Sequence, residues 1–162
     1  EAMRHAVDIA HEAGRRVSLS LSDPLCVARH RDEFQFLIEH SVDILFANED
    51  EARALYELED LEETLLVLEE VCEVTAVTRG GRGSIILGPE GRVEVPAEQV
   101  AKRVDTTGAG DLYAAGFLHA FTEGHEAGTC ARVGSIAAAE VITHIGARPE
   151  ADLRAMISER VR

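Results

Sequence analysis

Short apolar segments typical of β-strands alternate along this chain with segments that have the periodicity of amphipathic helices. Such alternation predicts an α/β fold with a mainly parallel sheet. We expect strands at residues 16–24 (running into a loop), 42–48, 74–78, 84–88 and 92–96. We expect helices at residues 2–13, 33–39, 49–58, 61–72, 108–121, 129–144 and 151–161. Short turns separate the last three strands, which therefore predict a β-meander.

Length and composition narrow the class of protein. The chain has 162 residues, 46% of them apolar, which is enough for one domain with a real core. A formal net charge of −14 without a Lys/Arg cluster argues against a nucleic-acid partner. No apolar run reaches membrane-spanning length, so we expect no membrane partner. The cysteines, Cys26, Cys72 and Cys130, are widely spaced and odd in number, which favours a reducing, cytoplasmic location.

In parallel α/β sheets, ligands bind where a strand passes into a helix, and the most informative such junction is Gly108-Ala109-Gly110-Asp111. The first N–H groups of a helix lack intrahelical partners, and small residues let an anion approach them. A carboxylate beside bound phosphate is useful if it accepts a proton from an attacking hydroxyl. The structural alternative is that Asp111 stabilises a helix N-terminus and the glycines allow close packing.

Two further junctions have polar or glycine-rich patterns. Asn48 and Glu51 begin a helical segment and suit the outer-shell support of hydrated Mg²⁺. Taken alone, however, the pair is more often an Asn N-cap with an acidic first turn, since such caps are common. In "VTRGGRG", Thr78, Gly80 and Gly83 could bring backbone and hydroxyl groups close to a nucleotide, or could simply form a hairpin turn.

Other common site patterns do not fit. The Rossmann glycine pattern is incomplete because Tyr113 stands where the third glycine would be. The chain contains no Walker A sequence, H-E-x-x-H set or G-x-S-x-G elbow. An NAD-binding domain is therefore a weak alternative.

Together and in this order, the three junctions resemble the ribokinase family, also called the phosphofructokinase-B family of carbohydrate and nucleoside kinases. "DTTGAGD" at 105–111 looks like its C-terminal signature, "NEDE" at 48–51 like its N-x-x-E motif, and "VTRGGRG" at 77–83 like its T-x-G-x-x-G segment. "GARP" at 146–149 is also similar. Within the family, segments 18–24 and 42–52 resemble adenosine kinases more than sugar kinases.

The resemblance implies a three-layer α/β/α fold and an ATP-dependent phosphoryl transfer carried by positioning and electrostatics. Asp111 would be the general base for the acceptor hydroxyl. Gly108, Ala109 and Gly110 would form the anion hole for the transferred phosphoryl group. The remaining roles implied are Mg²⁺ organisation by Asn48 and Glu51, an ATP site at Thr78, Gly80 and Gly83, and, as in some members, a K⁺ site near Asp105 and Thr107.

The resemblance covers residues 1–162 but only the C-terminal, nucleotide-binding half of a typical member. We therefore expect a fragment without the N-terminal half and lid that supply much of the acceptor pocket, and we expect it to be inactive by itself. The acceptor would be a small molecule, with adenosine favoured and a sugar as the alternative. A non-catalytic nucleotide-binding module is the alternative from another class. An exposed sheet edge would also allow a homo-oligomer.

Overall fold

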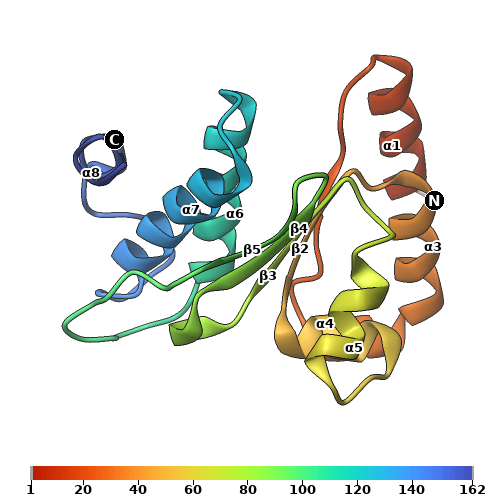
Figure 1. Ribbon diagram of the computed structural model, residues 1–162, viewed down its shortest axis with the longest axis horizontal. Helices are drawn as coiled ribbons and strands as arrows, with labels where there is room; N and C mark the ends of the chain where they lie inside the picture. Colours follow the sequence, from red (N-terminus) through yellow and green to blue (C-terminus); the bar gives the residue numbers. More distant parts are fainter. Residues whose placement is uncertain (1, 162) are drawn as a thin grey trace. The chain divides into compact units, whose positions relative to one another are not determined.

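The structure is a computed structural model that describes residues 2–161 and shows a mixed α/β fold (Figure 1). The strands are β1 (Ser18–Ser20), β2 (Ile44–Asn48), β3 (Val74–Thr78), β4 (Ser84–Gly88) and β5 (Gly91–Val95). The helices are α1 (Ala2–Glu12), α2 (Pro24–Arg29), α3 (Arg31–Ser41), α4 (Glu49–Tyr56), α5 (Leu61–Leu68), α6 (Ala109–Thr122), α7 (Ala127–Val141) and α8 (Leu153–Arg160). A short 3-10 turn, η1 (Gly80–Arg82), lies between β3 and β4.

The strands in the described residues form one sheet in the order β1-β2-β3-β4-β5. Strands β1 and β2 are parallel, with Ser18 opposite Ile44 and Ser20 opposite Phe46. Because β3, β4 and β5 are neighbours both in the sheet and along the chain, the predicted β-meander is confirmed. The chain divides into two compact units, and the division passes through these three strands. The first unit contains the residues up to Val77 and Leu87–Arg92; the second contains Thr78–Ile86 and the residues from Val93 onward.

One helix of the first unit was not expected from the sequence. The Asp23-Pro24 step reads as a loop, but α2 begins at Pro24. The Asp23 carboxylate caps this helix by accepting the Cys26 N–H at 2.7 Å, and proline is well suited to a first helical position because its missing N–H would have no partner there. The helix predicted at 61–72 is also shorter, since α5 ends at Leu68.

The core of the first unit is aliphatic. Strand β2 is buried over Ile44–Ala47, and Leu55 of α4 and Leu65 of α5 are almost fully shielded from solvent. At the edge of this unit, the Arg4 guanidinium of α1 lies 4.7 Å from the ring centroid of Phe36 in α3. Burial of apolar side chains on both faces of β2 and on the inner faces of the helices is therefore what holds these elements together.

In the second unit, α6 and α7 run side by side in very close contact (Figure 1). A Cβ atom on Gly116 would lie 2.9 Å from the Val133 carbonyl oxygen, and one on Gly134 would lie 2.7 Å from that of Tyr113. The two glycines thus let the helix backbones approach directly. Although both helices are rich in alanine, no helix among the described residues is long and apolar enough to cross a membrane.

A buried carboxylate fixes the segment that follows α7. Glu140 accepts hydrogen bonds from the N–H groups of Glu150 and Ala151 at 2.9 and 2.8 Å, and His144 Nε2 lies 3.4 Å from the same oxygen. Burial alone would raise the pKa of Glu140, but the two N–H groups and His144 outweigh it and lower the pKa. Desolvation alone would lower the pKa of His144, but the Ile145 carbonyl and the nearby carboxylates outweigh it and raise the pKa.

These opposite pKa shifts predict that the free energy of unfolding falls both at low pH and at high pH. The Glu140 contribution is present above about pH 4.5 and is lost as the pH falls through its lowered pKa. The His144 contribution is complete below about pH 6.5 and is lost as the pH rises through its raised pKa. We expect Glu140→Gln to lower the unfolding free energy by about 1 kcal/mol near pH 6 and to flatten this profile, because Gln keeps an acceptor but loses the charge.

Thermal unfolding between pH 4 and 8 measures the profile, and an NMR titration of His144 measures the pKa directly. Glu150→Gln is the matched control, since the Glu150 carboxylate is exposed and lies 3.8 Å from His144 Nδ1. It should change the profile less than Glu140→Gln does. A His144 pKa that is the same in Glu140→Gln and in the parent protein would contradict the prediction.

Candidate functional site

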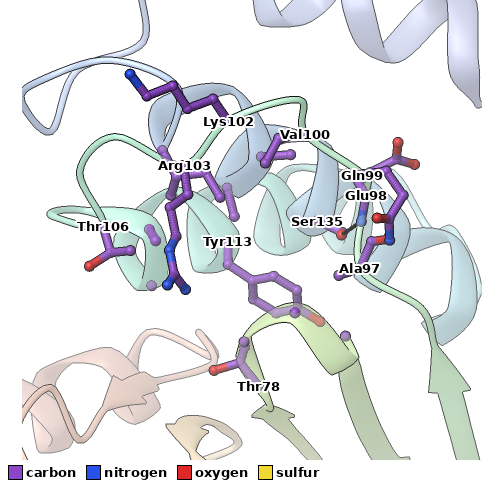
Figure 2. A pocket seen from close by; sticks show the side chains of 18 of the residues that line it. Thr78, Ala97, Glu98, Gln99, Val100, Lys102, Arg103, Thr106, Tyr113 and Ser135 are labelled. Atoms are coloured by element: carbon purple, nitrogen blue, oxygen red, sulfur yellow. Dashed lines mark hydrogen bonds between the residues drawn. The ribbon is translucent and has the colours of Figure 1, made fainter.

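A pocket of about 490 Å³ lies within the second unit (Figure 2). Its walls are the glycine-rich turn after β3, residues 97–103, the first turn of α6 and one side of α7. The pocket brings together two segments that are about 30 positions apart in the sequence, namely the turn containing Gly80 and Gly83 and the helix start at Ala109 and Gly110. The structure thus joins two of the three junctions singled out from the sequence.

The turn after β3 requires glycine at a specific position. Gly83 has φ +87°, and its carbonyl accepts the Arg79 N–H at 2.7 Å, which closes the turn. A side chain at this position would collide with the Val95 carbonyl oxygen and would place Cβ 2.8 Å from the Ala97 nitrogen. The turn is therefore held against the end of β5, and Thr78, Gly80 and Gly83 all line the pocket.

The start of α6 also has the local structure expected from the sequence. Gly108 is the N-cap, with φ +80°, and a Cβ there would lie 2.7 Å from the Ala147 methyl group. No side chain caps this helix start, and the Ala109 N–H donates to the Thr106 carbonyl at 3.1 Å. Ala109 and Gly110 line the pocket, so the positive end of the helix dipole lies at its wall.

Asp111 lies in the first turn of α6 and is exposed, as the role of a proton acceptor for an incoming substrate would require. Asp111 and Gly108 are next to the pocket-lining residues Ala109 and Gly110 in the chain but are not themselves part of the pocket wall.

Asp105 ties the segment before α6 to the segment after α7. One oxygen accepts the Thr107 N–H at 3.0 Å and the Thr107 hydroxyl at 2.7 Å, and the other accepts the Gly146 N–H at 3.0 Å. The bonds from Thr107 N–H, Gly146 N–H and the Thr107 hydroxyl lower the pKa of Asp105 to about 2. The carboxylate is therefore charged at neutral pH and already holds three donors, so any role as a cation ligand would use its remaining lone pairs.

Asn48 and Glu51 belong to the first unit and form a reciprocal capping box at the start of α4. Asn48 Oδ1 accepts the Asp50 and Glu51 N–H groups at 2.9 and 2.8 Å, while the Glu51 carboxylate accepts the Asn48 N–H at 2.9 Å and its side-chain amide at 2.7 Å. Burial raises the pKa of the Glu51 carboxyl. Asn48 Oδ1 already holds two donors, whereas the Glu51 carboxylate keeps further acceptor capacity. The Glu51 side of the pair therefore fits contact with a hydrated Mg²⁺ through water, whereas direct coordination would compete with the cap. No group of three or more His, Cys, Asp or Glu suited to a metal occurs within residues 2–161.

A buried hydrogen bond between Tyr113 and Ser84 lies at the pocket and was not predicted from the sequence, where Tyr113 only argues against a Rossmann motif. The Tyr113 hydroxyl donates to Ser84 Oγ at 2.7 Å, and the two side chains are 5% and 1% exposed. Burial raises the pKa of Tyr113 well above its usual value, so the hydroxyl stays protonated. The bond connects α6 to the residue that directly follows Gly83.

We expect Tyr113→Phe to lower the free energy of unfolding by about 1–3 kcal/mol, because it leaves the buried Ser84 hydroxyl without its partner. Replacing both partners, Tyr113→Phe with Ser84→Ala, should cost less than the sum of the two single changes. Urea denaturation measures all three variants. Tyr56→Phe is the matched control, since the Tyr56 hydroxyl is buried without a hydrogen-bond partner among the described residues, and its removal should be near neutral. Equal losses at Tyr113 and Tyr56 would contradict the prediction.

The sequence analysis also missed the pocket wall formed by residues 97–103. Here the Glu98 N–H donates to Ser135 Oγ of α7 at 2.9 Å, which anchors the segment. Lys102 and Arg103 close this wall next to Thr106. A basic pair in an acidic chain was the one signal that could have pointed to it.

A glycine turn and an uncapped helix start that share one pocket are features of the class of α/β proteins with sites suited to an anionic ligand such as a phosphate ester. Residues 1–153 match the model of the pfkB family carbohydrate kinases, and the chain belongs to this family. The family and the ribokinase-like α/β fold expected from the sequence are therefore confirmed.

Individual relatives include kinases of different acceptors. The chain is 45% identical to the adenosine kinase of Sinorhizobium meliloti, with a TM-score of 0.95 over 99% of this chain and 49% of that one. It is 42% identical to a protein described as a probable sugar kinase, from Rhizobium etli CFN 42, with a TM-score of 0.96 over the same shares. It is 34% identical over 111 residues to the nucleoside kinase of Methanocaldococcus jannaschii, which is 65% of this chain and 34% of that relative. The chain thus spans half or less of the length of these proteins.

Proposed function

We propose that this chain is the nucleotide-binding part of an ATP-dependent kinase that phosphorylates a nucleoside hydroxyl, converting adenosine to AMP. The observation that carries the proposal is the single pocket shared by the glycine turn at Thr78–Gly83 and the first turn of α6. Backbone N–H donors and a helix N-terminus suit a polyphosphate, and an apolar wall suits the nucleobase of ATP. Both kinds of surface line this pocket, the second through residues such as Val100 and Ile142.

In this proposal each part of the chain has a defined task. Thr78, Gly80 and Gly83 line the ATP site. Gly108, Ala109 and Gly110 form the anion hole for the transferred phosphoryl group, where the fixed dipole of the helix start stabilises developing charge. The Ala109 N–H is shared with the Thr106 carbonyl. The exposed Asp111 carboxylate accepts the proton of the acceptor hydroxyl as that oxygen attacks phosphorus.

The proposal includes two cation sites. Asn48 and Glu51 would hold hydrated Mg²⁺ through water, and Mg²⁺ supplies charge neutralisation for the polyphosphate in a chain whose net charge is −14. Asp105 and Thr107 would contribute to a K⁺ site, for which the charged Asp105 carboxylate is the principal attraction.

The domain assignment follows from the same proposal. Residues 1–162 would form the C-terminal nucleotide-binding part of a ribokinase-like kinase domain, and the rest of that domain would supply much of the acceptor pocket. The 49% of the adenosine kinase of S. meliloti that this chain matches supports this division. A cytoplasmic setting, in which ATP and a nucleoside are both present, is part of the proposal.

The direct test measures ADP release from ATP by the complete kinase with adenosine, cytidine, ribose and fructose as separate acceptors. Adenosine should give the highest kcat/KM. A sugar kinase of the same family is the second candidate, favoured by the 42% identity to the R. etli protein, and it predicts turnover of ribose or fructose instead. Binding of ATP without turnover of any acceptor would favour a non-catalytic nucleotide-binding module.

A further inference from the structure

The charged side chains around the pocket differ in direction and in pairing. The charged lining residues are Glu98, Lys102 and Arg103. Figure 2 shows the Arg103 side chain running into the pocket, where its guanidinium ends between Thr106 and Tyr113, whereas Lys102 extends away from them. Of these two adjacent basic residues, only Arg103 therefore directs its charge into the pocket.

Arg103 lacks a counter-ion among the residues that the structure describes. The one acidic lining residue, Glu98, is 3.4 Å from the guanidinium of Arg160 in α8. Elsewhere in the second unit, Arg79 is paired with Glu94 at 3.0 Å. Arg103 is exposed. A chain with 30 acidic and 16 basic residues has ample carboxylates to neutralise an arginine, so an unpaired guanidinium directed into a pocket is available to an anion from outside.

The neighbouring backbone supports the same ligand. Ala109 and Gly110 form the pocket wall at the positive end of α6. The Ala109 N–H is already donated to Thr106, so the anion-binding capacity of this helix start is reduced by one donor. A guanidinium supplies paired N–H donors in a planar fork that matches phosphate oxygens, and such charge-assisted bonds are stronger than neutral ones.

We propose that Arg103 binds the phosphate chain of the nucleotide in this pocket and makes the site selective for a nucleoside triphosphate over the uncharged nucleoside. The inference rests on the proposed function, because it takes the pocket to be the nucleotide site. In this role Arg103 supplies positive charge for the phosphates in a chain that is otherwise strongly acidic. It is a binding residue for the phosphates, while the apolar side of the pocket receives the base.

Isothermal titration calorimetry with ATP and with adenosine tests this on the parent protein and on Arg103→Ala, Arg103→Lys and Lys102→Ala. Loss of the charge-assisted bonds should weaken ATP binding about 10- to 100-fold in Arg103→Ala. Arg103→Lys should lie between this variant and the parent protein, since lysine keeps the charge but not the fork. Lys102→Ala is the matched control and should change ATP affinity less than about threefold, because its charge points away and is screened. The affinity for adenosine, which has the base and ribose but no phosphate, should be unchanged in all variants.

The outcomes separate this inference from the proposed function. If the parent protein binds ATP and Arg103→Ala binds it equally well, the role of Arg103 is wrong and the nucleotide site stands. If Arg103→Ala weakens ATP and adenosine by the same factor, or if Lys102→Ala has the same effect as Arg103→Ala, specific phosphate recognition by Arg103 is also wrong. If the parent protein does not bind ATP at all, both proposals fail. Thermal unfolding of each variant verifies that the exposed substitutions leave the fold intact.

Discussion

Replacing Asp111 by Asn should lower turnover by about 10²- to 10⁴-fold while leaving ATP affinity within about threefold of the parent value. Asn has nearly the same shape as Asp but cannot accept the proton of the attacking hydroxyl. Because Asp111 is exposed and is not part of the pocket wall, its replacement should not disturb nucleotide binding. Steady-state assays of the complete kinase give kcat and KM, and calorimetry gives the ATP affinity.

Asp8→Asn is the matched control for this experiment. Asp8 is also an exposed helical aspartate, in α1 of the first unit, and the same chemical change there should leave kcat unchanged. Unchanged turnover in Asp111→Asn would remove Asp111 from the role of general base. A large drop in ATP affinity together with kcat would instead indicate that the carboxylate supports the site structure.

The second large effect is expected at the turn after β3. Gly83→Ala should lower the free energy of unfolding by about 3 kcal/mol or more, because the new methyl group meets the Val95 carbonyl oxygen and the φ of +87° disfavours any side chain. The same change should open the turn that lines the pocket and weaken ATP binding. Urea denaturation and calorimetry measure the two effects.

Gly81→Ala is the matched control for Gly83→Ala. Gly81 also lines the pocket, but a Cβ there would have no heavy atom within 4 Å, and its φ is not positive. It should change stability by less than about 1 kcal/mol. If both substitutions had the same small effect, the argument from the contact with Val95 would be wrong.

The features that the sequence predicted are those with a local physical cause. The start of α6 directly after Gly108 follows from a glycine before a helical apolar pattern, and the β-meander follows from short turns between apolar segments. At Asn48 the sequence left a helix cap and a metal ligand as alternatives. The capping box confirms the first, and its free acceptor capacity leaves the second a proposal.

The features that the sequence did not predict depend on contacts between distant residues. The partners Ser84 and Tyr113 are 29 positions apart, and each has an ordinary local explanation as a strand or helix residue. The direction of Arg103 into the pocket depends on how residues 97–103 are anchored by Ser135 of α7. No local pattern encodes such an anchor, because it arises from packing of the complete second unit. Helix α2 was missed for a different reason, since the Asp-Pro step that begins it is equally typical of a turn.

The glycine contacts between α6 and α7 restrict the ways in which the second unit can move. Sliding α6 along α7 would drive the backbone at Gly116 into that of Val133 and Gly134, where less than a methyl group of space separates the helices. The two helices should therefore move as one rigid body during nucleotide exchange. The proposed general base at the start of α6 should keep a fixed position relative to α7. Any opening and closing of the pocket would fall on its other walls, namely residues 97–106 and the segment that begins at Ile142. We therefore expect amide hydrogen exchange to be slow along α6 and α7 and to be slowed by ATP in those two segments.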